Sequence, residues 1–190
     1  MIRSGLLCVS IFAVATGLCC AADAPVQAPR TPDCVFVGTP NDVVERMVAM
    51  AKITKEDLVC DPGCGDARML VAAAKLHGCR GVGYEIDPDR IAEAQQLIKK
   101  RRVESLVRIE VKDIFTVDYR NNTVILMYLL PDMITRLLPQ FEQLRPGSRI
   151  VAHDYEISGI EPDEVVDFKS NEDNVSHALY LYTTPLKKKS

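Results

Sequence analysis

Hydrophobic positions follow two different periods along the chain, and the two periods alternate. Short apolar runs, typical of buried strands, occupy residues 58–61, 80–86, 107–113, 122–130 and the second half of 145–157. Apolar residues recur with helical spacing in the segments between and before them, at 39–53, 67–78, 87–103 and 131–144. Strands that alternate with helices indicate an α/β fold with a mostly parallel sheet.

The end of the chain departs from this alternation. Segments 163–170 and 177–184 predict two strands that pair as an antiparallel hairpin at one edge of the sheet. In the preceding helical segment, Pro131 is well placed to begin the helix, whereas Pro139 should kink it or end it early. The fold therefore has seven predicted strands and no internal repeat.

The first residues predict a leader rather than part of the domain. Arg3 precedes an uncharged, mostly apolar run from Leu6 to Cys20, as in a signal peptide that ends near Ala22. The run is shorter than the roughly 20 apolar residues of a membrane-spanning helix, although an anchor stays an alternative. We expect a signal peptide or apolar leader at 1–22, a Pro-rich linker at 23–34, the domain at 35–185 and a basic tail at 186–190.

The composition argues against a nucleic-acid partner, and the spacing of the cysteines and histidines argues against a metal site or a disulfide framework. The formal net charge is -3 and the basic residues form only two short runs, so no nucleic-acid groove is predicted. Four of the seven cysteines lie after the leader, and their spacing matches neither a zinc motif nor a disulfide framework. The three histidines also lack ligand spacing, so no metal site is predicted. Buried thiols are expected.

A glycine-rich turn, "DPGCGDA" at 61–67, follows the first predicted strand and indicates a ligand site. A dinucleotide fingerprint needs a third glycine in G-x-G-x-x-G, but Arg68 occupies that position. The carboxylate of Asp61, two residues before Gly63, would repel a pyrophosphate and would attract a cationic amino-acid group. The turn therefore favours S-adenosylmethionine, which carries an ammonium and a sulfonium and no phosphate.

With these residues the sequence resembles motif I of the class I S-adenosylmethionine-dependent methyltransferases, Ala67 standing for the usual third glycine. The resemblance implies a Rossmann-like seven-stranded sheet, mostly parallel, with helices on both faces and an antiparallel C-terminal hairpin. It also implies cofactor contacts at the ends of successive strands: Asp61, Gly63 and Gly65 in the turn, Glu85 at the ribose hydroxyls, Asp113 at the adenine, and Tyr128 beside the methyl group.

A narrower resemblance depends on "VFVGTPNDVVERMVAMA", "DPGCGDARMLVAAAK", "GVGYEIDP" and "MYLLP". Together they are similar to the small protein-lysine methyltransferases related to those of the ATP synthase c subunit and the adenine nucleotide translocase, and to their bacterial relatives. In that family the segment containing Thr39 and Pro40 closes over the cofactor. The resemblance implies a protein substrate with an accessible lysine. As a hypothesis of our own, Tyr128 and the carbonyls of Leu129 and Leu130 orient the amine, and Asp132 is the proton acceptor.

Alternatives remain for single residues and for the whole chain. Asp113 also fits a turn cap, Tyr128 a core aromatic residue, and His153 with Asp154 a second polar pair near the cleft. The chain also fits a non-catalytic exported module that binds S-adenosylmethionine, or a methyltransferase for a small molecule; an NAD enzyme fits less well. The leader predicts export or membrane association and leaves exposure on the cytoplasmic side open.

Overall fold

The structure is a computed structural model that describes residues 31–33 and 35–189. The predicted leader and most of the predicted linker lie outside these residues. Seven strands form one sheet in the order β3-β2-β1-β4-β5-β7-β6, in which only β7 runs antiparallel to its neighbours. The strands are β1 (Leu58–Pro62), β2 (Arg80–Glu85), β3 (Val107–Val111), β4 (Val124–Met127), β5 (Arg149–His153), β6 (Glu164–Lys169) and β7 (Ser176–Thr183).

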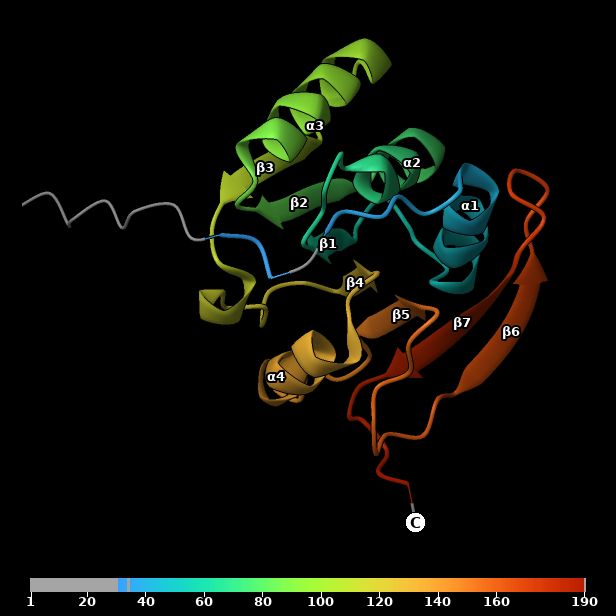
Figure 1. Ribbon diagram of the computed structural model, residues 1–190. Coiled ribbons are helices and arrows are strands. Elements are labelled where there is room, and N and C mark those ends of the chain that lie inside the picture. The colour runs from blue at the N-terminus through green and yellow to red at the C-terminus, as the bar shows by residue number, and fades with distance from the viewer. Residues whose placement is uncertain (1–30, 34, 190) are drawn as a thin grey trace, which may run out of the picture.

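Helices cover both faces of this sheet, as predicted. They are α1 (Asn41–Met50), α2 (Arg68–His77), α3 (Pro88–Arg101) and α4 (Pro131–Phe141), with a short 3-10 turn η1 (Ile114–Thr116). Figure 1 shows α1, α2 and α3 along one face and α4 on the other. In the described ranges, no helix combines the length and the apolar character needed to cross a membrane.

The central strands are apolar at consecutive positions because both of their faces are covered. In β4, Val124 and Leu126 belong to the core beneath α1 and α2, whereas Ile125 and Met127 belong to the core beneath α4. All four side chains are fully buried. The period of two therefore distributes one short segment between two hydrophobic cores.

Two local features refine the predicted elements. Pro139 lies inside α4, which ends two residues later at Phe141 instead of continuing to 144. Cys60, Cys64 and Cys79 are buried and free, which confirms the expectation for these three; Cys34 lies outside the described residues.

The basic tail is joined to the domain rather than separate from it. The backbone forms an antiparallel bridge between Ile160 and Lys188, and Lys187 donates from Nζ to Asp163 at 2.6 Å. The side chains of the three lysines stay exposed. The run is therefore a solvated edge of the fold.

The strand order also locates the site. The chain builds the sheet outward in one direction from β1 to β3 and then returns to place β4 on the other side of β1. In open α/β sheets, ligands bind outside the carboxyl ends of the strands at such a reversal. The glycine-rich turn after β1 lies at this point.

Candidate functional site

A cavity opens at the carboxyl ends of β1, β2 and β4, and most of the predicted cofactor residues line it. Its empty volume is about 900 Å³ when the open solvent at its mouth is included. The predicted residues in its wall are Thr39, Asp61, Gly63, Glu85, Asp113 and Tyr128. Pro40, Gly65 and Asp132 are outside this lining.

Asp61 provides a buried negative group in the wall of the cavity. The residue is 3% exposed, and burial raises the pKa of its carboxyl well above the ordinary value. The nearby carboxylates of Glu85 and Asp66 raise this pKa further. Among the described residues, no lysine or arginine forms an ion pair with Asp61. The carboxylate therefore suits a cationic ligand group that would replace the lost hydration.

Glu85 is the last residue of β2 and holds the glycine-rich turn. Its Oε2 accepts from Gly65 N at 2.9 Å, and its Oε1 accepts from Ile86 N at 2.8 Å and Asp87 N at 3.0 Å. A carboxylate has about four acceptor positions, so about one remains. The half-buried side chain thus fixes its own orientation and keeps limited capacity for a ligand hydroxyl.

Asp113 follows β3 and caps the next turn, which is the alternative role considered from the sequence. Its Oδ1 accepts from Phe115 N at 3.0 Å at the start of η1. The half-buried side chain also lines the cavity. Capping orients Asp113 and does not exclude a ligand contact.

The turn after β1 requires left-handed backbone at three residues. Gly63, Gly65 and Ala67 have φ values of 73°, 52° and 63°. The amides of Gly63 and Cys64 both donate to Tyr84 O, at 2.8 and 3.1 Å, which ties the turn to β2. Ala67 is fully buried just before α2. Its φ lies in the left-handed region, which glycine adopts more easily than alanine.

Phe36 is a site residue that the sequence reasoning missed. Its ring lies so close to Gly65 that a Cβ at this glycine would stand 2.0 Å from Phe36 Cε2. The ring also lies 5.1 Å from the guanidinium of Arg90 and 5.9 Å from that of Arg68. The Phe36 ring, which lines the cavity, therefore packs directly on the glycine-rich turn at Gly65.

Arg68, which occupies the position of the third glycine in a dinucleotide fingerprint, holds the Thr-Pro segment in place. Its Nη1 donates to Thr39 O at 2.8 Å, while Nε and Nη2 pair with the carboxylate of Asp66. The guanidinium also fills the space beside Gly38, where a Cβ would be 2.7 Å from it. The departure from the dinucleotide fingerprint thus has a structural role, since the arginine anchors residues 36–39.

Charges around the cavity disfavour phosphate. The three basic residues in its wall each face an acid: Arg68 pairs with Asp66 at 2.7 Å, Arg90 with Glu93 at 2.6 Å and Lys112 with Glu110 at 2.6 Å. The acidic residues in the wall are Asp33, Asp61, Asp66, Glu85, Asp87 and Asp113. The cavity is therefore suited to a cationic ligand.

The segment after β4 forms the far end of the cavity. Tyr128 is half-buried, and its ring lies 4.1 Å from that of His153 and stacks on Tyr155 at 6.1 Å. Burial, and then the charge of Asp154, raises the pKa of Tyr128, so the phenol is neutral at neutral pH. Buried Leu129 also lines the cavity.

Leu130 and Asp132, the other residues predicted on the acceptor side, do not line the cavity. The carbonyl of Leu130 accepts from Ile134 N at 3.1 Å and so belongs to the first turn of α4. Asp132 is exposed in this turn. Among the described residues, neither group has a hydrogen bond or ion pair that would direct it into the cavity.

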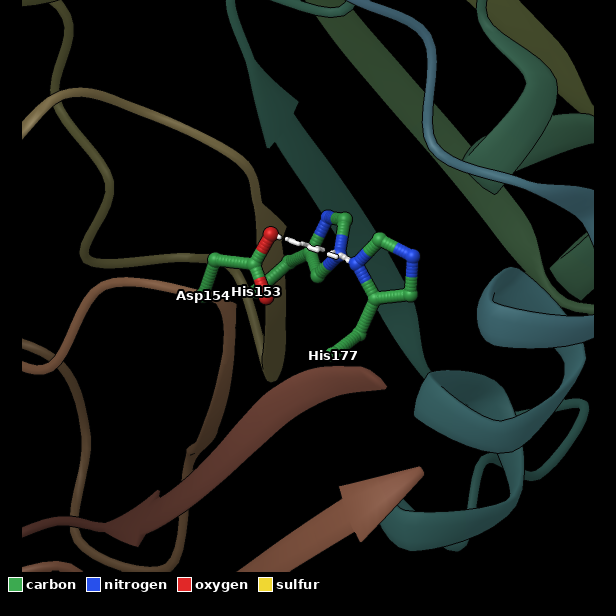
Figure 2. Close-up of side chains that lie close together, drawn as sticks. All are labelled: His153, Asp154 and His177. Carbon is green, nitrogen blue, oxygen red and sulfur yellow. Dashed lines mark hydrogen bonds and ion pairs between the residues drawn. The ribbon is translucent and has the colours of Figure 1, made fainter. Parts of the chain in front are cut away.

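A polar cluster lies behind Tyr128. His153 and Asp154 are adjacent in the sequence and His177 follows Asp154 by 23 residues, but the pairing of β5 with β7 brings His177 to the other two, as Figure 2 shows. Burial lowers the pKa of His153 to about 4, although Asp154 acts in the opposite direction. The pKa of His177 is raised: burial would lower it, but hydrogen bonds with Asp154 and Asp173 raise it more. Only strand register could have revealed this cluster in the sequence.

Comparisons with known proteins agree with this geometry. The model of a family described as the ANTKMT methyltransferase domain matches residues 61–164. A protein-lysine N-methyltransferase of Saccharolobus islandicus (strain REY15A) is 40% identical over 153 residues, which are 80% of this chain and 94% of the relative. A Homo sapiens protein named as the lysine N-methyltransferase of the ATP synthase c subunit is 27% identical, and the match covers 83% of this chain and 64% of that protein.

Solved structures show the same arrangement. An RNA methyltransferase from Salinibacter ruber, in complex with S-adenosyl-L-homocysteine, has a TM-score of 0.73 and 39% identity; the match covers 78% of this chain and 94% of that one. A geranyl diphosphate methyltransferase in complex with SAM has a TM-score of 0.61 at 12% identity, covering 78% and 85%, and shares the fold alone.

Proposed function

The chain belongs to the ANTKMT methyltransferase domain family, and we propose from this premise that it transfers a methyl group from S-adenosylmethionine to a lysine side chain of a protein. The observation that carries the proposal is the 40% identity to a relative named protein-lysine N-methyltransferase, over nearly the whole length of that relative. The cavity supports it with a buried acid at one end and a neutral tyrosine at the other.

The residues of the cavity fit S-adenosylmethionine. Asp61 is a buried carboxylate without a cationic partner among the described residues, so a ligand ammonium would compensate for its burial. Glu85 keeps a free acceptor position for a ribose hydroxyl, and Asp113 lies next along the sheet edge for the adenine. When bound, the cofactor supplies a methyl group on a sulfonium, which is already activated for transfer to a nucleophile.

The acceptor end needs a neutral amine. A lysine has an ordinary pKa of about 10.4, and an apolar surrounding lowers that value by penalising the ammonium form. Leu129 and Met133 provide such a surrounding in the cavity wall. We assign Tyr128 the role of orienting the amine through its neutral hydroxyl. Exposed Asp132 is assigned the role of passing the proton to solvent.

The decisive experiment measures binding and transfer separately. Purified protein is titrated with S-adenosylmethionine by calorimetry and then incubated with the methyl-labelled cofactor and a cell lysate. Label on lysine in protein bands supports the proposal. Binding without transfer indicates a non-catalytic module, label in an organic extract indicates a small-molecule acceptor, and label in RNA would favour the activity named for the Salinibacter ruber relative.

Two variants test the acceptor side. Tyr128→Phe and Asp132→Asn should each lower kcat about 10-fold or more while cofactor affinity stays within about 2-fold. Thr135→Val, on the exposed side of the same helix, is the control. If both acceptor-side variants turn over like the wild type with cofactor bound, the two assigned roles are wrong, whereas the lysine proposal itself depends on the transfer assay.

The leader adds a proposal about location. The apolar run at 1–22 supports export or membrane association of the domain, and its cleavage near Ala22 would release it. Sequencing the amino terminus of the mature protein tests cleavage, and membrane fractionation tests association. An intact terminus in a soluble fraction would contradict both.

A further inference from the structure

Three atoms that bear lone pairs converge behind Tyr128. His153 Nε2 lies 2.9 Å from His177 Nδ1, and Asp154 Oδ2 lies 3.2 Å from His177 Nδ1 and 3.3 Å from His153 Nε2 (Figure 2). In a tetrahedral zinc site with ligand bonds of about 2.0–2.1 Å, neighbouring ligand atoms are about 3.3–3.4 Å apart. The triangle is therefore close in size to one face of such a site.

The outer nitrogen of each histidine is already held by another group. His177 Nε2 lies 3.1 Å from Asp173 Oδ2, and His153 Nδ1 lies 3.1 Å from Thr39 Oγ1. Metal-binding histidines typically have such a partner on the nitrogen that does not bind the metal, since it fixes the tautomer and the ring orientation. With these outer hydrogen bonds donated by the rings, both inner nitrogens present lone pairs to the same point.

The carboxylate of Asp154 is aimed in the same way. Its Oδ1 accepts from Ala178 N at 3.1 Å, which leaves Oδ2 for the converging group. Asp154 has a φ of 59°, a left-handed conformation that is uncommon outside glycine, at the end of β5.

Three lone pairs that meet at one point need a positive charge between them. A proton satisfies two of the atoms, whereas a divalent ion satisfies all three. Two imidazoles and one carboxylate suit zinc and related transition metals, while magnesium and calcium prefer oxygen ligands. The side chain of Asp154 is 27% exposed, so one side of the triangle is accessible for entry of an ion and for a water ligand.

We propose that His153, Asp154 and His177 form a binding site for a divalent transition-metal ion of the zinc type. The ion joins β5 to β7 and fixes the His153 imidazole, which in turn contacts Thr39 in the wall of the cofactor cavity. The site lies outside the residues that the methyl transfer uses and contributes no group to that reaction.

The test uses the full-length protein after chelator treatment and removal of the chelator. Co²⁺ is added at neutral pH as a spectroscopic probe and Zn²⁺ as its competitor. We expect one Co²⁺ per chain with visible d–d absorption and no thiolate charge-transfer band, its displacement by Zn²⁺, and a higher Tm with Zn²⁺.

Variants separate this site from other metal ligands. His177→Gln and Asp154→Asn should weaken Zn²⁺ binding about 100-fold or more, and His77→Gln, an exposed histidine in α2, should leave it unchanged. Asparagine adopts left-handed backbone readily, so Asp154→Asn keeps the fold; calorimetry with S-adenosylmethionine on the same samples checks this.

Two outcomes overturn the proposal. One is a wild-type affinity for Zn²⁺ equal to that of both site variants. The other is a thiolate band, which would assign the ion to cysteines. Neither outcome concerns methyl transfer, so the proposed function is tested independently.

Discussion

Replacing Arg68 with alanine should loosen the Thr-Pro segment without unfolding the domain. The variant loses the hydrogen bond from Nη1 to Thr39 O at 2.8 Å and the contact with the Phe36 ring at 5.9 Å. A hydrogen bond from a charged donor contributes about 1.5–3 kcal/mol, and partial exposure of the side chain reduces this to about 1–2 kcal/mol. The ring contact adds about 0.5 kcal/mol, so the docked segment loses about 2 kcal/mol.

That loss should appear in cofactor affinity, because residues of the segment form part of the cavity wall. If binding requires the docked segment, the apparent Kd rises by up to about 30-fold, and the Tm moves by only a few degrees. Calorimetry with S-adenosyl-L-homocysteine measures the affinity, and hydrogen exchange of residues 35–39 measures the docking.

Arg120→Ala is the matched control. Arg120 pairs with Asp118 two residues before it, in the same two-pronged geometry that Arg68 has with Asp66, but on an exposed surface. It should change neither quantity. Wild-type affinity and unchanged exchange in Arg68→Ala would refute the anchoring role.

Three further predictions concern stability. Asp61→Asn should stabilise the free protein by about 1 kcal/mol or more at neutral pH and weaken cofactor binding at least 10-fold. Because the pKa of Asp61 is raised on folding, the stability that the wild type has with a protonated carboxyl is present at acid pH and lost as the pH rises. Urea titrations should therefore show a smaller gain in the stability of the variant over the wild type at pH 4 than at pH 7. Ala67→Gly relieves left-handed strain and should change the free energy of unfolding by less than about 1 kcal/mol, whereas Ala73→Gly, buried within α2, should lower it by about 2 kcal/mol. Burial would raise the pKa of Asp57, but hydrogen bonds from two threonines and the charge of Arg149 outweigh it, so this pKa is lowered. Asp57→Asn should therefore lower the free energy of unfolding by about 1–3 kcal/mol at neutral pH. The difference from the wild type should disappear as acid protonates the wild-type carboxyl.

The elements of the fold could be predicted because each has a local signal. Asp87 before Pro88, at the beginning of the predicted helical segment 87–103, is such a signal for α3, and its carboxylate accepts from Asp89 N at 2.9 Å. Strand order is a different matter, since residues 122–130 could pair with any neighbour in a parallel sheet. The structure supplies the order, and the order then places the site.

The site could be predicted only where ligand residues follow strands directly. Asp61, Glu85, Asp113 and Tyr128 lie at strand ends, which meet at one edge of a parallel sheet, so their proximity follows from the element pattern. Phe36 belongs to a segment without a period, and nothing in its neighbourhood predicts that it lies on Gly65.

Thr39 shows why the remaining geometry depends on tertiary contacts. The residue is 2% exposed, and two of its groups are held from opposite directions: its carbonyl by Arg68 in α2 and its hydroxyl by His153 in β5. Neither partner is near it in the chain, so the sequence identifies a Thr-Pro segment but not what fixes it. Buried polar groups cost free energy unless they are hydrogen-bonded, and here the two bonds are made by residues whose other contacts belong to the glycine-rich turn and to the histidine cluster. Any change that moves Arg68 or His153 must therefore either move Thr39 or leave one of its polar groups unsatisfied, which makes this threonine the point where the two clusters are physically connected.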